Sequence, residues 1–222
     1  MQNYTLVRER ASVFATNKVL RNTYLLLSLT LLFSAGTATW ATLCNVPYPG
    51  VFVSILGMFG LLFLTRSLCN SGWGILAVFA FTGFMGYTLA PTLHFYLHNF
   101  ANGSAIITTA VGGTGIIFFL LSAFVLITRK DFSFMGGFLF AGIMVALIAS
   151  IAGLFFNLPI FQVFISAVFM LLCSGLILFH TSQIISGGET NYIMATISLY
   201  VALLNIFVSL LNILGFFAGS RR

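Results

Sequence analysis

Charged residues are scarce in this sequence. Only nine lysines and arginines and three acidic residues occur among 222, which is 5% of the chain. A soluble domain carries about 25% charged residues, and it needs them to cover its water-facing surface. With 60% hydrophobic residues and a mean hydropathy of +1.11, the chain cannot be a soluble globule.

Long polar stretches are also absent after the first 21 residues, and the apolar residues form blocks of about 20, the length that crosses roughly 30 Å of hydrocarbon as a helix. The blocks are continuous rather than alternating, which excludes a β-barrel. The sequence therefore predicts an all-α, polytopic membrane protein. Its expected parts are a basic N-terminal tail (1–21), a seven-helix transmembrane domain (22–217) and a short C-terminal tail (218–222). The expected spans are 22–43, 51–68, 73–97, 104–128, 134–156, 160–184 and 192–217. The first apolar block exceeds the 7–15 residues of a signal-peptide core, so we expect it to be a retained span.

The few basic residues predict the orientation. Cytosolic loops of membrane proteins are enriched in lysine and arginine. The N-terminal tail and the loops after the second and fourth spans hold Arg8, Arg10, Lys18, Arg21, Arg66, Arg129 and Lys130, whereas the alternate loops hold none. The N-terminus is therefore expected in the cytosol, and the net charge of +6 is a topology signal rather than a nucleic-acid-binding one. Arg221 and Arg222 disagree with this pattern. Either the tail crosses the membrane or the last segment is re-entrant, and the length of the last block favours seven full spans.

No acidic residue lies within a predicted span. Glu9, Asp131 and Glu189 all fall in the tail or in loops, which argues against a proton-coupled transporter that relays protons through buried carboxylates. His180, near the cytosolic end of the sixth span, is the one ionisable candidate inside the membrane. It could titrate near neutral pH and bias a helix arrangement, or it could be an interfacial histidine bonded to a carbonyl.

Metal ligands and catalytic groups are equally rare. The three cysteines (Cys44, Cys69, Cys173) have no metal-ligand spacing and are expected to pack as small apolar residues. His94 and His98 share a helix face but have no third ligand, so an interfacial role is favoured over zinc. We expect no cofactor and no enzymatic activity.

Several long strings carry a family resemblance. They are TRKDFSF at 128–134, GGETNYI at 187–193 and SLYVALLNIFVSLLNILG at 198–215, extended by FAFTGF at 79–84 and KVLRNTY at 18–24. On these strings the chain resembles the Bax inhibitor family (transmembrane Bax-inhibitor-motif proteins), and it is most similar to a proteobacterial branch that modulates the membrane-anchored protease FtsH.

The resemblance implies a seven-span bundle in which the last helix is central, and a non-enzymatic, stress-related role. It implies an inner-membrane protein that binds and inhibits the FtsH-type protease complex. The alternative that it implies is a pH-dependent calcium leak. By motif matching, the pH-sensing or ion-path positions of the family fall on Arg66, His180 and Ala202. Only the arginine is retained, and neither imidazole nor a methyl group supplies the oxygen ligands that calcium prefers.

Two further sets are expected to meet a partner or to shape the cytosolic face. The N-terminal tail is the one long free cytosolic segment, and its candidate partner-binding residues are Arg8, Glu9, Arg10 and Lys18. The cytosolic loop motifs are Arg129, Lys130 and Asp131 in one loop, and Gly187, Gly188 and Glu189 in another.

Overall fold

The structure, a computed structural model, describes residues 2–156 and 159–219, with side chains described for 18–153 and 160–219. These residues form seven helices and no strands: α1 (Gln2–Leu43), α2 (Val51–Leu68), α3 (Gly74–Asn99), α4 (Gly103–Thr128), α5 (Met135–Phe156), α6 (Pro159–Ser186) and α7 (Tyr192–Gly219). Each contains a stretch long and apolar enough to cross a membrane, so the predicted all-α, seven-span class is confirmed. The ends of α2 to α7 agree with the predicted spans to within two residues.

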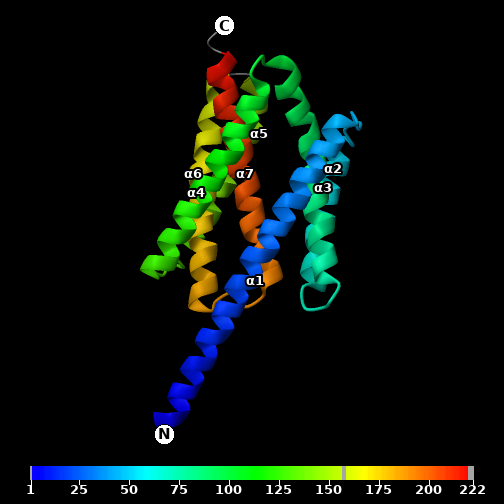
Figure 1. Ribbon diagram of the computed structural model, residues 1–222. Coiled ribbons are helices and arrows are strands. Elements are labelled where there is room, and N and C mark those ends of the chain that lie inside the picture. The colour runs from blue at the N-terminus through cyan, green and yellow to red at the C-terminus, as the bar shows by residue number, and fades with distance from the viewer. Residues whose placement is uncertain (1, 157–158, 220–222) are drawn as a thin grey trace. The chain divides into compact units, whose positions relative to one another are not determined.

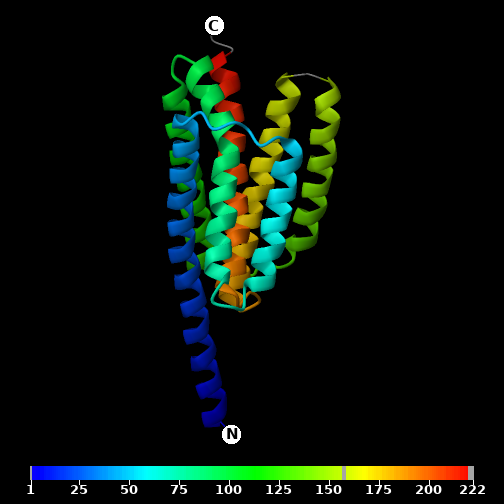
Figure 2. The same cartoon turned by 90° about the vertical axis from the view of Figure 1, so that its right-hand side faces the viewer.

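The first helix is longer than its span. The predicted tail and the first apolar block form one helix from Gln2 to Leu43, of which Lys18–Leu43 is the candidate span. No glycine or proline occurs before Gly36, so nothing in the sequence interrupts the helix once it has formed. Figures 1 and 2 both show α1 running on beyond the ends of α2 and α3.

The chain divides into two compact units, each of which is described by itself. Unit 1 comprises Met1–Phe95 and Ile184–Tyr200, and unit 2 comprises Tyr96–Gln183 and Val201–Arg222. The last helix contributes core residues to both. In unit 1 its buried residues include Ile193, Leu199 and Tyr200, and in unit 2 they include Ala202, Leu203, Ile206 and Leu211. The last helix is thus a central element of each unit, as predicted.

Small residues allow the helices to approach closely. In unit 1, a Cβ on Gly86 of α3 would overlap the Ser34 carbonyl oxygen of α1. In unit 2, a Cβ on Gly142 of α5 would lie 2.7 Å from the Leu172 side chain of α6, and a Cβ on Gly175 would lie 2.6 Å from Leu139. Such close packing drives helix association in lipid, because lipid tails are as apolar as the helix surface and the hydrophobic effect does not favour contact between helices.

The length and continuity of the last helix distinguish a full span from a re-entrant segment. It is one uninterrupted helix of 28 residues, or roughly 42 Å at 1.5 Å per residue, which exceeds the hydrocarbon thickness. A re-entrant segment would need a break, and the described part of α7 has none. Arg221 and Arg222 lie outside the described residues.

Candidate functional site

The predicted pH-sensing positions lie on three different helices. His180 is half-buried on α6, where its ring packs edge-to-face on Phe179 with a centroid separation of 5.2 Å. Ala202 is fully buried on α7. Both belong to unit 2, whereas the exposed Arg66 stands in the last turn of α2 in unit 1. His180 makes no hydrogen bond with another described residue, and a pH-sensing or ion-path role for these three positions stays a prediction.

The loop between α4 and α5 contains Arg129, Lys130 and Asp131, all three exposed. Arg129 ends α4 in the left-handed conformation (φ 49°), with its N–H bonded to the Val125 carbonyl at 2.8 Å. The Asp131 carboxylate accepts hydrogen bonds from the Ser133 hydroxyl (2.5 Å) and the Ser133 N–H (2.8 Å). These bonds, together with a longer one from Ser182, lower the pKa of Asp131 below its ordinary value.

Two neighbours of His180 connect this loop to α6. The fully buried Ser182 hydroxyl accepts the Phe132 N–H at 2.9 Å and donates toward the Lys130 carbonyl at 3.3 Å. Gln183 donates its amide to the Ser133 hydroxyl at 2.9 Å. The end of α6 that carries His180 is therefore fixed to the loop after α4. Sequence reasoning missed Ser182 and Gln183; the polar run HTSQ at the end of an apolar span was the available signal.

The loop between α6 and α7 is organised by Asn191. Gly187 adopts φ 78° at the end of α6, and Gly188 follows it in an exposed turn. The Glu189 carboxylate accepts the Asn191 N–H at 2.8 Å. The Asn191 side chain in turn accepts the Ile193 N–H at 2.9 Å, which caps the N-terminus of α7.

Asn191 also connects this loop to the loop after α2, within unit 1. Its amide donates to the Cys69 carbonyl at 3.1 Å and to the Asn70 side chain at 2.9 Å. Asn191 therefore holds the two loops together, and the Glu189 carboxylate accepts the N–H of this same residue. Of the tail residues, Lys18 is exposed on α1, whereas Arg8, Glu9 and Arg10 lie outside the residues whose side chains are described.

A buried hydroxyl cluster lies at the centre of unit 1. Tyr200 of α7 is fully buried, and its O–H donates to the Thr82 carbonyl of α3 at 3.2 Å. Its oxygen then accepts the Ser34 hydroxyl of α1 at 2.6 Å. The ring packs edge-to-face on Phe81, 6.1 Å away. One side chain therefore joins three helices, and nothing in the sequence singled it out.

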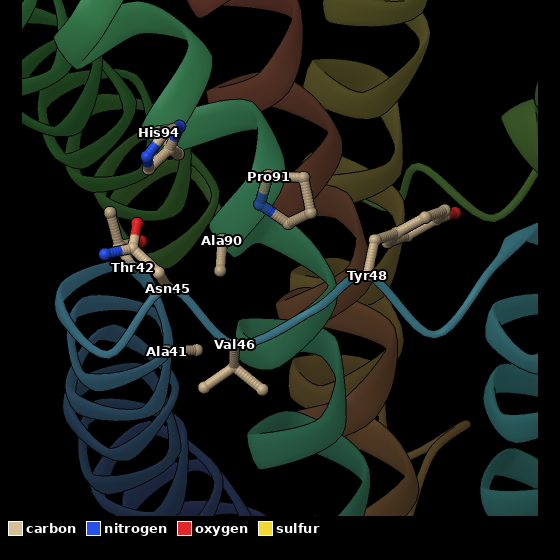
Figure 3. Close-up of a pocket in the computed structure, with 8 residues that line it drawn as sticks. All are labelled: Ala41, Thr42, Asn45, Val46, Tyr48, Ala90, Pro91 and His94. Carbon is tan, nitrogen blue, oxygen red and sulfur yellow. The ribbon is translucent and has the colours of Figure 1, made fainter.

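A pocket of about 250 Å³ lies in unit 1 where the α1–α2 loop passes α3 (Figure 3). His94 and Asn45 face the same part of the pocket in Figure 3, near Thr42, and Tyr48 directs its ring away from them. His94 thus lines a pocket beside Pro91 and Ala90. The described residues contain no group of three or more histidine, cysteine or acidic side chains that could hold a metal ion. The three cysteines are free, with Cys173 buried, Cys69 half-buried and Cys44 exposed.

Taken together, the fold and its polar contacts define a multi-pass helical membrane protein whose polar side chains connect helices and loops to one another. The chain belongs to the family described as inhibitor of apoptosis-promoting Bax1, whose model matches residues 16–219.

The names of individual relatives indicate a more specific role within this family. The chain is 58% identical, over 94% of both chains, to "Modulator of FtsH protease YccA" of Escherichia coli K12. It is equally similar to "Inner membrane protein YccA" of Escherichia coli O6:H1, and 52% identical to an uncharacterised protein of Pseudomonas aeruginosa over 99% of this chain and 98% of that one. The chain is accordingly a multi-pass inner-membrane protein, and the family and these names indicate a protease modulator rather than an enzyme.

Proposed function

We propose that this protein binds and inhibits an FtsH-type membrane protease from within the bacterial inner membrane, with its N-terminus in the cytosol. The observation that carries the proposal is the 58% identity, over 94% of both chains, to a protein named for modulating that protease. A resemblance of this length covers the loops as well as the spans, so the surfaces that would meet a partner are included.

The loop contacts support an inhibitor that the protease cannot unfold. A protease of this kind must grip an accessible segment before it can extract a membrane protein. The loops after α4 and α6 are held by Ser182 and by Asn191, through bonds of 2.9 Å to Phe132 and to Asn70. The N-terminal part of α1 is the segment that extends furthest beyond its neighbours in unit 1, so it is the part that we expect the protease to contact (Figures 1 and 2).

Deletion of residues 1–10 tests the role of this segment. Cells producing the full chain should degrade a membrane substrate of the protease more slowly, and the deletion should restore the rate seen without the chain while insertion is unchanged. A double replacement, Arg8→Gln with Arg10→Gln, serves as a matched control that keeps the length and removes the charge. A deletion that still inhibits would exclude the segment as the contact, whereas a full chain without any effect on turnover would contradict the proposed function itself.

Cysteine labelling tests the proposed cytosolic position of the N-terminus. In a C44S background, a cysteine introduced by Asn102→Cys in the α3–α4 connection should react with a membrane-impermeant thiol reagent in intact spheroplasts. A cysteine introduced by Ser71→Cys, in the α2–α3 connection, should react only after lysis. The reverse pattern would place the N-terminus outside the cytosol.

The residues at the matched positions do not favour a calcium leak as a second function. Calcium binding favours carboxylate oxygens, and the matched positions on α6 and α7 carry His180 and Ala202. No observation in the described residues supplies the missing ligands.

A further inference from the structure

A polar cavity of about 370 Å³ lies in unit 2, between the last turns of α5, the first turns of α6 and the middle of α7. Figure 2 shows α5 and α6 as neighbouring helices of this unit. Six of its lining residues carry hydroxyl or carboxamide groups: Ser150, Gln162, Ser166, Asn205, Ser209 and Asn212. The other lining residues are glycine or apolar, so the cavity has polar walls without any charge.

Two polar groups in this cavity, on Ser209 and Asn205, lack partners among the described residues. Ser209 is only 4% exposed, yet its hydroxyl makes no hydrogen bond within the described part of the chain. Asn205 donates its amide to the Val201 carbonyl at 2.8 Å, and its side-chain oxygen accepts nothing from the described residues. Neither atom is fully enclosed by protein, so an occupant of the cavity can reach and bond both of them.

The arrangement of the polar residues indicates how an occupant reaches them. Asn205, Ser209 and Asn212 follow one another at i, i+4 and i+7, which places them on one face of α7. Asn212 and Gln162 are exposed, whereas Ser209 and Ser166 are buried, so the polar lining runs from an exposed rim inward. The Asn212 amide bonds the Ser166 hydroxyl at 3.3 Å, and its oxygen accepts the Tyr96 hydroxyl at 3.4 Å. Both distances are long, and they leave room for stronger bonds to an occupant.

The chemistry of the lining selects a neutral occupant. A charge at membrane depth is expensive unless an opposite charge pairs with it, and this cavity offers none. Lipid tails cannot satisfy amides or hydroxyls. The neighbouring outward-facing residues Ile151 and Phe164 are 61% and 64% exposed, as expected of a lipid-facing surface around the rim. Water satisfies such groups when the space is polar and roomy enough, as it is here.

We propose that this cavity is a hydrated binding site within the membrane for water and small neutral hydrogen-bonding molecules, and that it discriminates against ions. Ser209 and Asn205 are the inner ligands, and Gln162 and Asn212 are the groups that an entering molecule meets first. The site is separate from the α4–α5 loop contacts around Ser182, and it does not depend on protease inhibition.

Cysteine reactivity tests the proposal, because a thiol must ionise in water before it reacts with a methanethiosulfonate. In a background with Cys44, Cys69 and Cys173 replaced by alanine, the variants S209C and S166C probe the cavity, and I151C and F164C are matched lipid-facing controls. Open membrane fragments expose both faces, so the result is independent of the orientation. The neutral probe is the 2-hydroxyethyl reagent, and the cationic probe is its trimethylammonium analogue. Rates are normalised to N102C.

We expect the neutral probe to modify S209C and S166C at least tenfold faster than I151C and F164C. We also expect it to modify them at least tenfold faster than the cationic probe does. Cavity rates as slow as the lipid-facing controls would show a dry cavity and overturn the proposal. Equal rates for the two probes would overturn the discrimination against ions. Size-exclusion chromatography identifies a variant that fails to fold. If one of the two cavity variants misfolds, the modification rate of the other still tests the proposal.

Discussion

Replacement of Tyr200 by phenylalanine isolates the buried hydroxyl cluster of unit 1. The phenylalanine keeps the ring and its edge-to-face contact with Phe81, and it removes only the hydroxyl. Two hydrogen bonds are lost, one of 2.6 Å with Ser34 and one of 3.2 Å with the Thr82 carbonyl. The Thr82 carbonyl already accepts a helical bond, so the main loss is at Ser34, which is only 5% exposed.

The expected cost follows from these bonds. Hydrogen bonds between membrane helices average about 0.6 kcal/mol and reach roughly 1.7, and the 2.6 Å bond is short, so we expect Tyr200→Phe to lower the free energy of unfolding by about 1 kcal/mol. Ser34 can recover part of this by turning to a carbonyl of its own helix, as Thr39 does toward Ala35 at 2.8 Å.

Reversible unfolding in mixed micelles, followed by tryptophan fluorescence, measures this change. A double-mutant cycle with Ser34→Ala should give a coupling free energy of about 0.5–1 kcal/mol, because the two side chains share one bond. Tyr48→Phe is the control: Tyr48 is 47% exposed, and its loss should stay within about 0.5 kcal/mol. A Tyr200→Phe variant as stable as the parent, with no coupling to Ser34, would refute the view that this cluster joins the three helices.

Three further predictions concern the loops. Ser182→Ala removes the acceptor of the Phe132 N–H, so hydrogen exchange at 130–133 should accelerate by roughly fivefold, equivalent to about 1 kcal/mol; unchanged exchange would show that Ser182 does not hold the loop. Asn191→Ala removes the cap of α7, so the unfolding free energy should fall by about 1–2 kcal/mol and the first turn of α7 should exchange faster, whereas an unaltered first turn would argue against the cap. The pKa of Asp131 is lowered in the folded protein, so its contribution is present above the ordinary value of 3.8 and is lost as the pH falls through the lowered pKa. Exchange at 131–133 should therefore rise below about pH 4 in the parent but stay independent of pH in Asp131→Asn after correction for intrinsic rates, and a parent without this rise would contradict the assignment.

The spans could be predicted from the sequence because hydrocarbon thickness and apolar length determine them almost alone. The bounds of α2 are the same in prediction and structure, and those of α7 differ by two residues at one end. The start of α1 could not be placed in the same way. Residues 2–17 are polar enough to end a span, but they contain no residue that ends a helix.

The polar contacts between helices and between loops could not be predicted, because each joins segments far apart in the sequence. Tyr200 and Ser34 are 166 residues apart, and Asn191 and Asn70 are 121 apart. Serine, tyrosine and asparagine occur throughout the spans and loops, so no local pattern distinguishes the ones that bond across helices. The loop motif that contains Asn191 is one of the strings that carry the family resemblance, but the resemblance does not give the role of that side chain.

The most direct test of the central claim is capture of the protease by the intact chain. An affinity-tagged full-length protein, produced at its natural level and extracted from native membranes in a mild detergent, should co-purify the FtsH-type protease. The enrichment should be at least tenfold over that obtained with an equally abundant, tagged seven-span protein of another family. Equal recovery of the protease with both proteins would contradict the account that this bundle acts by binding it.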